Sequence, residues 1–254
     1  MLNIVVPMAG RGSRFRQAGF MLPKPLIPVG GRPMIEVVIE NIRPRTPHRF
    51  IFITLRELAE SHQVDRRLRQ WAHGAEVHFV DGVTEGAACT VLTVKSLIDN
   101  RQPLMIANCD QFVDIDIQDY LDQLDRDHSD GLIMTMWADH PKWSYVRSDS
   151  HGRVCEVVEK QVVSNDATVG IYNYRHGCDF VAAAESMIRK NLRVNGEFYV
   201  APAYNEMLAQ GARLSLYNIG REYAGMHGLG IPEDLEIFER MLADRQLKRF
   251  ARAA

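Results

Sequence analysis

The sequence predicts a three-layer α/β fold with a mostly parallel central sheet and a small β-hairpin elaboration. Two observations lead to this prediction. Short apolar runs alternate with segments of helical periodicity in the first hundred or so residues, as in parallel strands joined by helices. Further along, strand-like runs follow one another across a tight turn, as in a hairpin. We expect a single domain over residues 1–254, made of two halves, 1–130 and 131–254.

The first half is expected to begin with a strand buried on both faces, because its first run is apolar and rich in β-branched residues. A helix is expected to start near Pro33, since proline is favoured in a first helical turn. The expected strands are Leu2–Val6, Arg49–Thr54, Ala75–Val80 and Leu104–Ala107, and the expected helices are Met34–Ile42, Glu57–Trp71 and Ala87–Ile98.

The second half is expected to add the hairpin, with its turn at Asp149–Gly152, and to continue the same sheet. Gly211 is a typical helix stop. The expected strands are Gly131–Ala138, Trp143–Arg147, Val154–Val158, Val169–Tyr174 and Arg213–Asn218, and the expected helices are Asp179–Asn191, Val200–Gln210 and the segment from Pro232 onward.

Composition excludes several classes of protein. The formal net charge is -2, so no basic excess indicates a nucleic-acid partner or an anionic membrane surface. No apolar stretch approaches the roughly 20 residues of a membrane helix, and the first apolar run is too short for a signal peptide. The 4 cysteines are scattered without zinc-ligand spacing. We expect free thiols and a cytoplasmic location.

A glycine-rich loop follows the first expected strand, with the sequence GRGSR over Gly10–Arg14. Glycines at this place let the backbone approach a phosphate, and successive N–H groups can bind its oxygens. The loop matches neither the Walker pattern nor a dinucleotide fingerprint. Arg14 adds a fixed cation beside it, which favours phosphate binding over an ordinary turn.

Lys24 lies between two prolines, ten residues after this loop. The prolines restrict the backbone on both sides of the lysine. A lysine that only solvates a surface loop needs no such restraint, whereas one that must meet a phosphate does. The spacing therefore favours a functional lysine over a structural turn.

Asp110 follows the fourth expected strand, after Asn108 and Cys109. A carboxylate at the carboxyl end of a parallel strand lies where such sheets bind ligands. Mg²⁺ prefers one or two protein carboxylates together with phosphate oxygens. Asp114 and Asp116 are interpreted as the solvated start of the next helix. The pair Glu159 and Lys160 closes the hairpin, and by itself it predicts no more than a surface ion pair.

Taken together, the run MAGRGSRF…LPKPLIPVGGRPMIE closely resembles the N-terminal signature of the sugar-1-phosphate nucleotidyltransferases, also called nucleotide-sugar pyrophosphorylases. Related choline-phosphate and phosphonate cytidylyltransferases share this signature. The resemblance spans nearly the whole chain in the right order. It continues through Asn108–Asp110, the VVEK segment Val157–Lys160, Gly170, Glu197–Tyr199 and Gly230–Asp234.

The resemblance implies a Rossmann-like, GT-A-like nucleotidyltransferase fold, with 1–130 as the nucleotide-binding half and 131–254 as the acceptor-binding half. Arg14, Lys24 and Asp110 would be catalytic, with Asp110 as the ligand of Mg²⁺. The residues implied to contact the nucleotide are Ala9, Gly10, Gly12, Ser13, Glu85 and Gly86. Those implied to contact the acceptor are Glu159, Lys160, Gly170, Glu197 and Tyr199.

One position departs from the family pattern. The family usually supplies a second metal-binding aspartate two residues before the glycine that corresponds to Gly230, and here that position is Gly228. The neighbouring His227 is a poor match for Mg²⁺, which favours oxygen ligands. Glu233 and Asp234 are interpreted as the acidic start of the terminal helix, where they favour the positive end of its dipole. The identity of a second metal ligand stays open.

The implied reaction transfers a nucleoside monophosphate from an NTP to a phosphorylated small molecule and releases pyrophosphate. A sugar-1-phosphate is the leading acceptor, which would give an activated nucleotide-sugar for surface polysaccharide synthesis. The alternatives are cytidylylation of a non-sugar phosphate or phosphonate, a glycosyltransferase that consumes a nucleotide-sugar, and a catalytically silent nucleotide-binding module. The nucleobase and the oligomeric state stay open, although a homo-oligomer is compatible with the composition.

Overall fold

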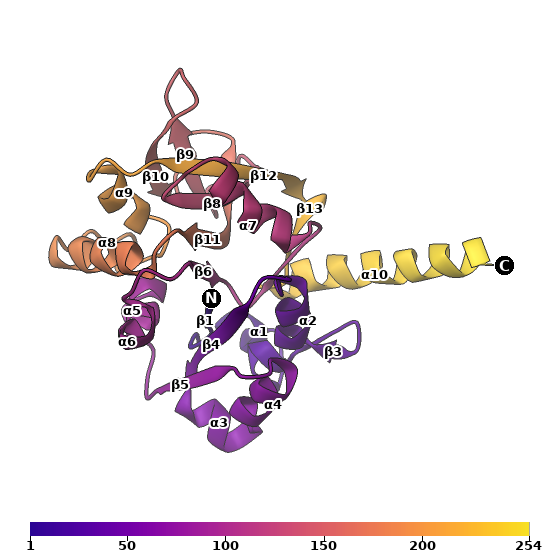
Figure 1. Ribbon diagram of the computed structural model, residues 1–254. Coiled ribbons are helices and arrows are strands. Elements are labelled where there is room, and N and C mark those ends of the chain that lie inside the picture. Colours follow the sequence, from indigo (N-terminus) through magenta and orange to yellow (C-terminus); the bar gives the residue numbers. More distant parts are fainter. Residues whose placement is uncertain (254) are drawn as a thin grey trace.

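An 11-stranded mixed sheet runs through the protein in the computed structural model, which describes residues 1–253 and the side chains of residues 1–244 (Figure 1). The strand order is β5-β4-β1-β6-β11-β8-β12-β13-β7, with β9 and β10 branching from β11. A separate two-stranded ribbon pairs β2 (Pro28–Val29) with β3 (Arg32–Pro33).

The first half supplies four parallel strands. They are β1 (Leu2–Pro7), β4 (His48–Leu55), β5 (Glu76–Val80) and β6 (Leu104–Ala107). Val5 of β1 pairs with Ile51 on one side and with Ile106 on the other. Because β1 and β6 are direct neighbours, the loops that follow them meet at one edge of the sheet.

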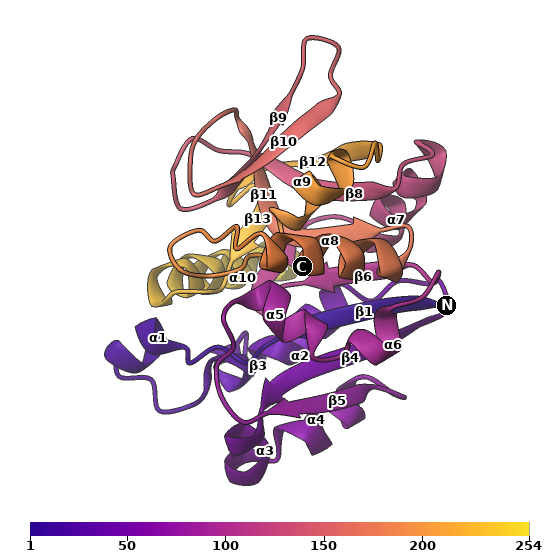
Figure 2. The same ribbon diagram turned by 90° about the vertical axis from the view of Figure 1, so that its left-hand side faces the viewer.

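The second half continues the same sheet through β11 (Asp166–Tyr174), which runs antiparallel to both β6 and β8 (Gly131–Trp137). Beyond β8 lie the parallel strand β12 (Leu214–Glu222) and the short strands β13 (Gly225–Gly228) and β7 (Gln111–Val113). The hairpin of β9 (Ser144–Ser148) and β10 (Val154–Glu159) projects from the body of the protein (Figure 2).

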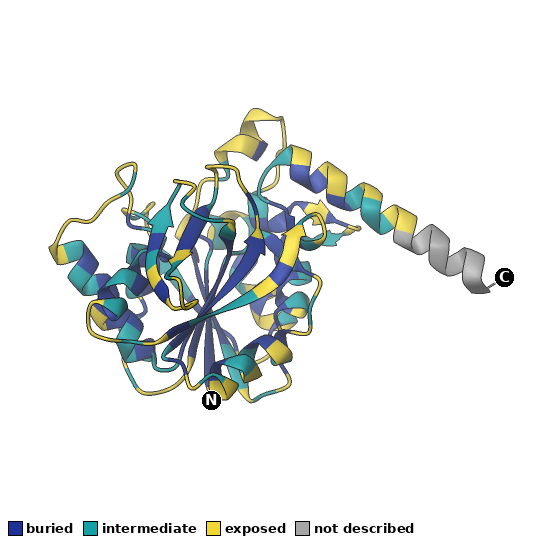
Figure 3. Cartoon of the chain, turned by 90° about the horizontal axis from the view of Figure 1, so that it is seen from above, coloured by how far each residue is buried: buried dark blue, intermediate teal, exposed yellow. Residues whose placement is uncertain are grey.

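Helices cover both faces of the sheet, and the sheet lies buried between them (Figure 3). One face packs α1 (Ser13–Gln17), α2 (Met34–Asn41), α4 (Val64–Trp71), α7 (Ile117–Arg126) and the first turns of α10 (Pro232–Ala253). The other packs α5 (Ala87–Leu92), α6 (Lys95–Ile98), α8 (Gly177–Arg189) and α9 (Ala203–Leu208). Successive residues of β1 point to opposite faces, so Ile4 joins the first core and Val5 the second. The predicted three-layer fold is confirmed.

Two predicted helices are broken in the structure. The segment 57–71 divides into α3 (Arg56–His62) and α4 because Gln63 adopts a left-handed conformation with φ of 51°. The segment 87–98 divides into α5 and α6 at Thr93, whose hydroxyl bonds to the carbonyl of Thr90 at 2.7 Å. A hydroxyl bonded to the backbone competes with continued helical pairing.

The prediction for Asp114 and Asp116 was half right. Asp116 begins α7 as expected, since its carboxylate accepts a hydrogen bond from the Gln118 amide at 2.9 Å. Asp114 is exposed as expected, but it lies before the helix and is not part of its first turn. The carboxylate of Asp114 contacts Nε2 of the buried His227 at 2.8 Å, because the short strand β13 places that histidine beside β7. The sequence did not predict this strand.

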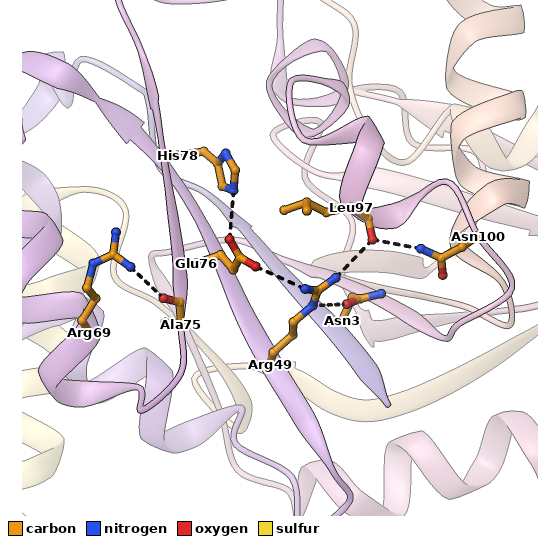
Figure 4. Close-up of polar contacts among 8 residues, drawn as sticks. All are labelled: Asn3, Arg49, Arg69, Ala75, Glu76, His78, Leu97 and Asn100. Atoms are coloured by element: carbon orange, nitrogen blue, oxygen red, sulfur yellow. Dashed lines mark hydrogen bonds and ion pairs between the residues drawn. The ribbon is translucent and has the colours of Figure 1, made fainter.

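A polar network holds the opposite, amino-terminal edge of the parallel strands (Figure 4). Nε of Arg49 donates to Oδ1 of the fully buried Asn3 at 2.7 Å. The same guanidinium reaches Glu76 at 3.3 Å and the carbonyl of Leu97 at 3.2 Å. These contacts join β1, β4 and β5 to α6, far from the carboxyl ends where a ligand is expected.

Candidate active site

Lys24 and Asp110 form an ion pair at the carboxyl edge of the parallel sheet. Asp110 follows β6 and Lys24 lies in the loop after β1, in the single-turn helix η1 (Lys24–Leu26). Their side chains are 21% and 20% exposed, so the pair is partly shielded from water and yet open to a ligand. The sequence predicted both residues, and the structure brings them together.

The two prolines around Lys24 restrain its backbone as predicted. Pro23 has an extended conformation with φ of -58° and ψ of 144°, and its carbonyl accepts the amide of Leu26 at 2.8 Å. The glycine-rich loop packs against this turn. Gly12 has φ of +59°, and a Cβ built on it would lie 3.1 Å from Cβ of Lys24. A side chain at this glycine would therefore both strain the loop and push on the lysine.

The electrostatics keep Lys24 charged and Cys109 neutral. Burial lowers the pKa of Lys24, but Asp110, with a further contribution from Cys109, more than offsets this effect, so the pKa lies above its ordinary value. Burial raises the pKa of the Cys109 thiol to about 12. Cys109 is thus a protonated packing residue at neutral pH, and the site holds a cation beside a carboxylate.

A cavity of about 510 Å³ lies on one side of this pair. Much of its lining is backbone and small side chains from the loops after β1 and β5. The lining includes Ala9, Gly10, Gly12, Gly86, Thr84 and Asn108, together with Lys24 and Asp110. Exposed amide groups on small residues are typical of a site that binds phosphate oxygens.

Gly86 holds one wall of this cavity against the chain at Phe198. It has φ of +132°, and a Cβ built on it would lie 2.5 Å from the Phe198 amide nitrogen. The Phe198 amide donates to the carbonyl of Glu85 at 2.8 Å, and its carbonyl accepts from Ala88 at 3.0 Å. This glycine is therefore required by close approach of two backbones.

The side chain of Glu85 points elsewhere. Its carboxylate pairs with Arg193, and it lines neither this cavity nor its neighbour. The guanidinium of Arg193 also lies over the ring of Phe198, 4.1 Å from its centroid. Sequence reasoning missed Arg193, because no local motif links it to a residue more than a hundred positions away.

A second cavity, of about 320 Å³, lies on the other side of Asp110, against the hairpin and β11. Long polar and aromatic side chains line it. Its lining includes Arg14, Asp110, Trp143, Glu159, Lys160, Gly170, Tyr172 and Tyr199. Asp110 lines both cavities, as do Ala87 and Asn108.

Lys160 is held in this second cavity by an unusual backbone. It follows β10 with φ of 56°, a conformation that costs a non-glycine residue roughly 1 kcal/mol or more. Its ammonium contacts the hydroxyl of Tyr199 and lies 4.6 Å from the centroid of that ring. A strained residue that presents a cation to a cavity is typical of a binding site.

Glu159 points into the same cavity and contacts the hydroxyl of Ser144. Burial raises its pKa above the ordinary value, even though Ser144 and Lys160 act in the opposite direction. The surface ion pair that the sequence alone suggested was wrong, since Glu159 contacts Ser144 and Lys160 contacts Tyr199.

Gly170 leaves room for two amide side chains behind the site. A Cβ built on it, at φ of +79°, would lie 2.6 Å from Oε1 of Gln111, and it would also collide with the amide of Asn108. The backbone carbonyl of Gly170 accepts the Asn108 amide at 3.0 Å. Asn108 lines both cavities, which its place beside Asp110 in the motif could have indicated.

The structure gathers most of the residues singled out in the sequence. Those that line the first cavity are Ala9, Gly10, Gly12, Lys24, Gly86, Asp110 and Glu197. Those that line the second are Arg14, Asp110, Glu159, Lys160, Gly170 and Tyr199. Ser13 and Glu85 line neither, and Glu197 lies on the first cavity, whereas the resemblance assigned it to the acceptor. The roles of all these residues stay predictions.

A family model described as nucleotidyl transferase matches residues 4–206. The chain belongs to this nucleotidyl transferase family. It is similar to the crystal structure of a nucleoside-diphosphate-sugar pyrophosphorylase from Vibrio cholerae RC9, with 25% identity and a TM-score of 0.79 over 93% of this chain and 99% of that one. The resemblance to sugar-1-phosphate nucleotidyltransferases is confirmed.

Other relatives carry the same kind of name. A UTP–glucose-1-phosphate uridylyltransferase, AglF of Haloferax volcanii, is 21% identical over 96% of this chain and 97% of its own length. A UDP-glucose pyrophosphorylase solved with UDP-glucose shares the fold, with a TM-score of 0.76 at 16% identity over 96% of this chain and 99% of that one. The chain matches only 35% of the length of a bifunctional GlmU protein from Cupriavidus metallidurans, at 26% identity over 65% of this chain.

No helix among the described residues has the length and apolar character needed to cross a membrane.

Proposed function

We propose that this protein is a nucleotidyltransferase that moves a nucleoside monophosphate from an NTP onto a phosphorylated small molecule, with a sugar-1-phosphate as the acceptor. The observation that carries the proposal is the position of Asp110. This residue lines both a cavity of about 510 Å³ and one of about 320 Å³. Two anionic substrates that bind in the two cavities would meet at this carboxylate and its lysine partner.

The reaction follows from the charges at that junction. A phosphate oxygen of the acceptor attacks the α-phosphorus of the NTP and forms a new P–O bond. The bond to the β-phosphate oxygen breaks, and pyrophosphate leaves with the electron pair. The acceptor is already ionised near neutral pH, so no side chain has to act as a nucleophile. Cations must offset the repulsion between the reactants and the charge on the leaving group.

The residues divide this work between the two cavities. Backbone amides of Gly10 and Gly12, which line the first cavity, would hold the phosphates of the NTP, and Arg14 would add positive charge from the second cavity. The ammonium of Lys24 would meet the transferred group, because it lies beside Asp110 at the junction. Lys160 would hold the phosphate of the acceptor from the opposite wall.

The residues at the junction fit Mg²⁺. Carboxylate oxygens are the ligands that this ion prefers, and Mg²⁺ is typically held by one or two carboxylates together with phosphate oxygens. Asp110 supplies one such carboxylate, open to both cavities. Bound Mg²⁺ would add positive charge at the phosphates. Among the described residues, no group of three or more His, Cys, Asp or Glu side chains is arranged to hold a metal, which suits an ion shared with a nucleotide.

A screen for released pyrophosphate tests the proposal. The four NTPs and dTTP, each with Mg²⁺, are offered with a panel of sugar-1-phosphates, phosphocholine and aminoethylphosphonate. A sugar-1-phosphate that releases pyrophosphate and forms a nucleotide-sugar would support the proposal. Turnover with only phosphocholine or the phosphonate would make the protein a cytidylyltransferase-type enzyme for a non-sugar acceptor.

Two variants tie turnover to the junction. Lys24→Ala and Asp110→Ala are expected to lower kcat/KM by at least about 10²–10³, the loss from one oxyanion-stabilising group. Lys95→Ala is the control, since that lysine pairs with Glu185 on the surface of α6. Near-normal pyrophosphate release from either variant would overturn the assignment. Nucleoside diphosphate released from a nucleotide-sugar would identify a glycosyltransferase instead.

We also place the reaction in the cytoplasm, where NTPs are made and thiols stay reduced. The 4 cysteines are free, which supports this placement. The proposed partners are an NTP and the acceptor, without a nucleic acid, in a monomer or a homo-oligomer.

A further inference from the structure

We propose that Asp234 supplies the second carboxylate of the magnesium site, in the space that a side chain on residue 228 would otherwise fill. This inference rests on the function proposed above. It explains why the chain has Gly228 where the related enzymes usually have an aspartate.

The space beside Gly228 already holds a carboxylate. Gly228 ends β13 and pairs with Gln111, directly after Asp110. A Cβ built on Gly228 would lie 2.9 Å from Oδ2 of Asp234 and 3.5 Å from its Cγ. The carboxylate of Asp234 therefore reaches the place from which an aspartate at 228 would extend.

Gly230 faces the other carboxylate in the same way. A Cβ built on Gly230 would lie 2.5 Å from Oδ2 of Asp110 and 3.5 Å from Nζ of Lys24. Two residues of extended chain span at most about 7 Å, so the two carboxylates contact positions whose Cα atoms lie no further apart than that. Asp110, Gly228, Gly230 and Asp234 all line the second cavity.

Asp234 is held in a fixed position. It is 8% exposed, and its Oδ1 accepts a hydrogen bond from the hydroxyl of Tyr223 at 2.7 Å. No donor among the described residues bonds to its Oδ2, the oxygen that faces Gly228. One oxygen is thus engaged for positioning and the other is available to a ligand.

The packing of α10 sets the direction of this side chain. Phe238, one turn after Asp234, is buried against Phe112 at 5.1 Å and against His227 at 5.3 Å between ring centroids. Phe112 lies in β7, which follows Asp110, and His227 lies in β13. The start of α10 is therefore fixed to the same two strands that carry Asp110 and Gly228.

A second explanation for Asp234 is that it only stabilises the positive end of the helix dipole. Glu233 separates the two explanations, because it shares the first turn of α10 but is exposed and lines neither cavity. A dipole effect requires neither burial nor a place in the cavity lining. Asp234 has both, and Mg²⁺ is commonly held by two carboxylates.

Binding of Mn²⁺, followed by electron paramagnetic resonance with and without pyrophosphate, tests the inference without relying on turnover. Asp234→Ala is expected to weaken Mn²⁺ binding at least about tenfold, since even outer-shell partners of a metal contribute that much. Glu233→Ala is the matched control and is expected to bind Mn²⁺ as the unaltered protein does. If Asp234→Ala folds poorly, Asp234→Asn serves instead, because it keeps the partner of Tyr223 and removes the charge.

Moving the carboxylate from position 234 to position 228 tests the inference more directly than removing it. Gly228→Asp in the Asp234→Ala background is expected to restore most of the Mn²⁺ affinity, since the new side chain enters the vacated space. In the unaltered background, Gly228→Asp is expected to weaken binding through collision and like-charge repulsion.

The outcomes separate this inference from the function on which it rests. Unchanged Mn²⁺ affinity in folded Asp234→Ala, with affinity lost in Asp110→Ala, would overturn the role of Asp234 and leave the proposed function standing. Normal Mn²⁺ binding by the unaltered protein with no pyrophosphate release from any acceptor would instead count against the proposed function. Recovery of Mn²⁺ affinity by Gly228→Asp in the Asp234→Ala background would show that a carboxylate at either position can serve as the second ligand.

Discussion

The two cavities that Asp110 lines differ in the kind of residues around them. Much of the lining of the first consists of small residues, among them Gly10, Gly12 and Gly86. The second has more long charged and aromatic side chains in its lining, among them Lys160 and Tyr199. A wall of backbone suits the phosphates common to all NTPs, whereas a wall of side chains can change with the acceptor.

The largest expected effect comes from adding a methyl group at Gly86, which lines the first cavity. Gly86→Ala forces a side chain into φ of +132° and against the backbone of Phe198. Strain and overpacking together are expected to lower the free energy of unfolding by about 2 kcal/mol or more and to raise the KM for NTP. Urea denaturation and initial rates measure the two effects.

Gly82→Ala is the matched control, since nothing lies within 4 Å of its added Cβ. If both alanine variants were equally stable and active, the close approach of Gly86 to the Phe198 backbone would not require a glycine.

On the side-chain wall, Lys160→Met is expected to raise the KM for the acceptor about ten- to hundredfold, since hydrogen bonds to charged groups contribute about 1.5–3 kcal/mol. The KM for NTP should change little, because Lys160 lines only the second cavity. Steady-state kinetics with each substrate varied in turn test this, with Lys95→Met as the control. A rise in the KM for NTP alone would reverse the assignment of the two cavities.

A smaller effect is expected from Glu159→Gln, and it depends on pH. Burial raises the pKa of Glu159 in the folded state, so the folded protein favours the protonated form. The resulting stability is fully present below the unfolded pKa of about 4.3 and is lost as pH rises through the higher folded pKa. Glutamine does not ionise, so the variant should gain stability relative to the unaltered protein over that rise.

Thermal unfolding measured between pH 4 and pH 8 checks this prediction. Parallel curves for the two proteins across that range would show that Glu159 keeps its ordinary pKa.

The smallest effect on turnover is expected at the opposite edge of the sheet. Arg49→Met leaves the buried oxygen of Asn3 without its donor, which costs about 1–3 kcal/mol of stability. For a chain of 254 residues this corresponds to a fall in Tm of about 2–4 °C per kcal/mol, with kcat/KM unchanged. Arg69→Met is the control, since this exposed arginine bonds to the carbonyl of Ala75, just beyond its own helix, and not to a buried side chain. A loss of turnover in Arg49→Met would show that the contacts of Arg49 influence the active site at the other end of the strands.

The contrast between local backbone features and long-range side-chain contacts also explains what the sequence could predict. Glycines, prolines and a strand-end aspartate act through the local backbone, so the loop at Gly10–Arg14, Lys24 and Asp110 could be placed together before the structure was known. The strand pattern likewise predicted the parallel half of the sheet. Hydrophobic periodicity carries this information because it depends only on neighbouring residues.

What could not be predicted depends on contacts between distant segments. The short strand β13 carries glycines and a histidine, which have no strong preference for strands. The pairing of Glu85 with Arg193 joins residues far apart in the sequence. Asp234 has the sequence context of an ordinary helix start, and only the packing of α10 turns it toward the cavity.

The pairing of β6 with β11 has a consequence for motion. Residues Leu104–Ala107 are bonded to Ile171–Tyr174, so one continuous sheet passes from the first half of the chain to the second. Hinge closure, in which two rigid bodies rotate about a flexible joint, would have to break this ladder. Amide hydrogens of β6 and β11, which form this ladder, are therefore expected to exchange only through global unfolding.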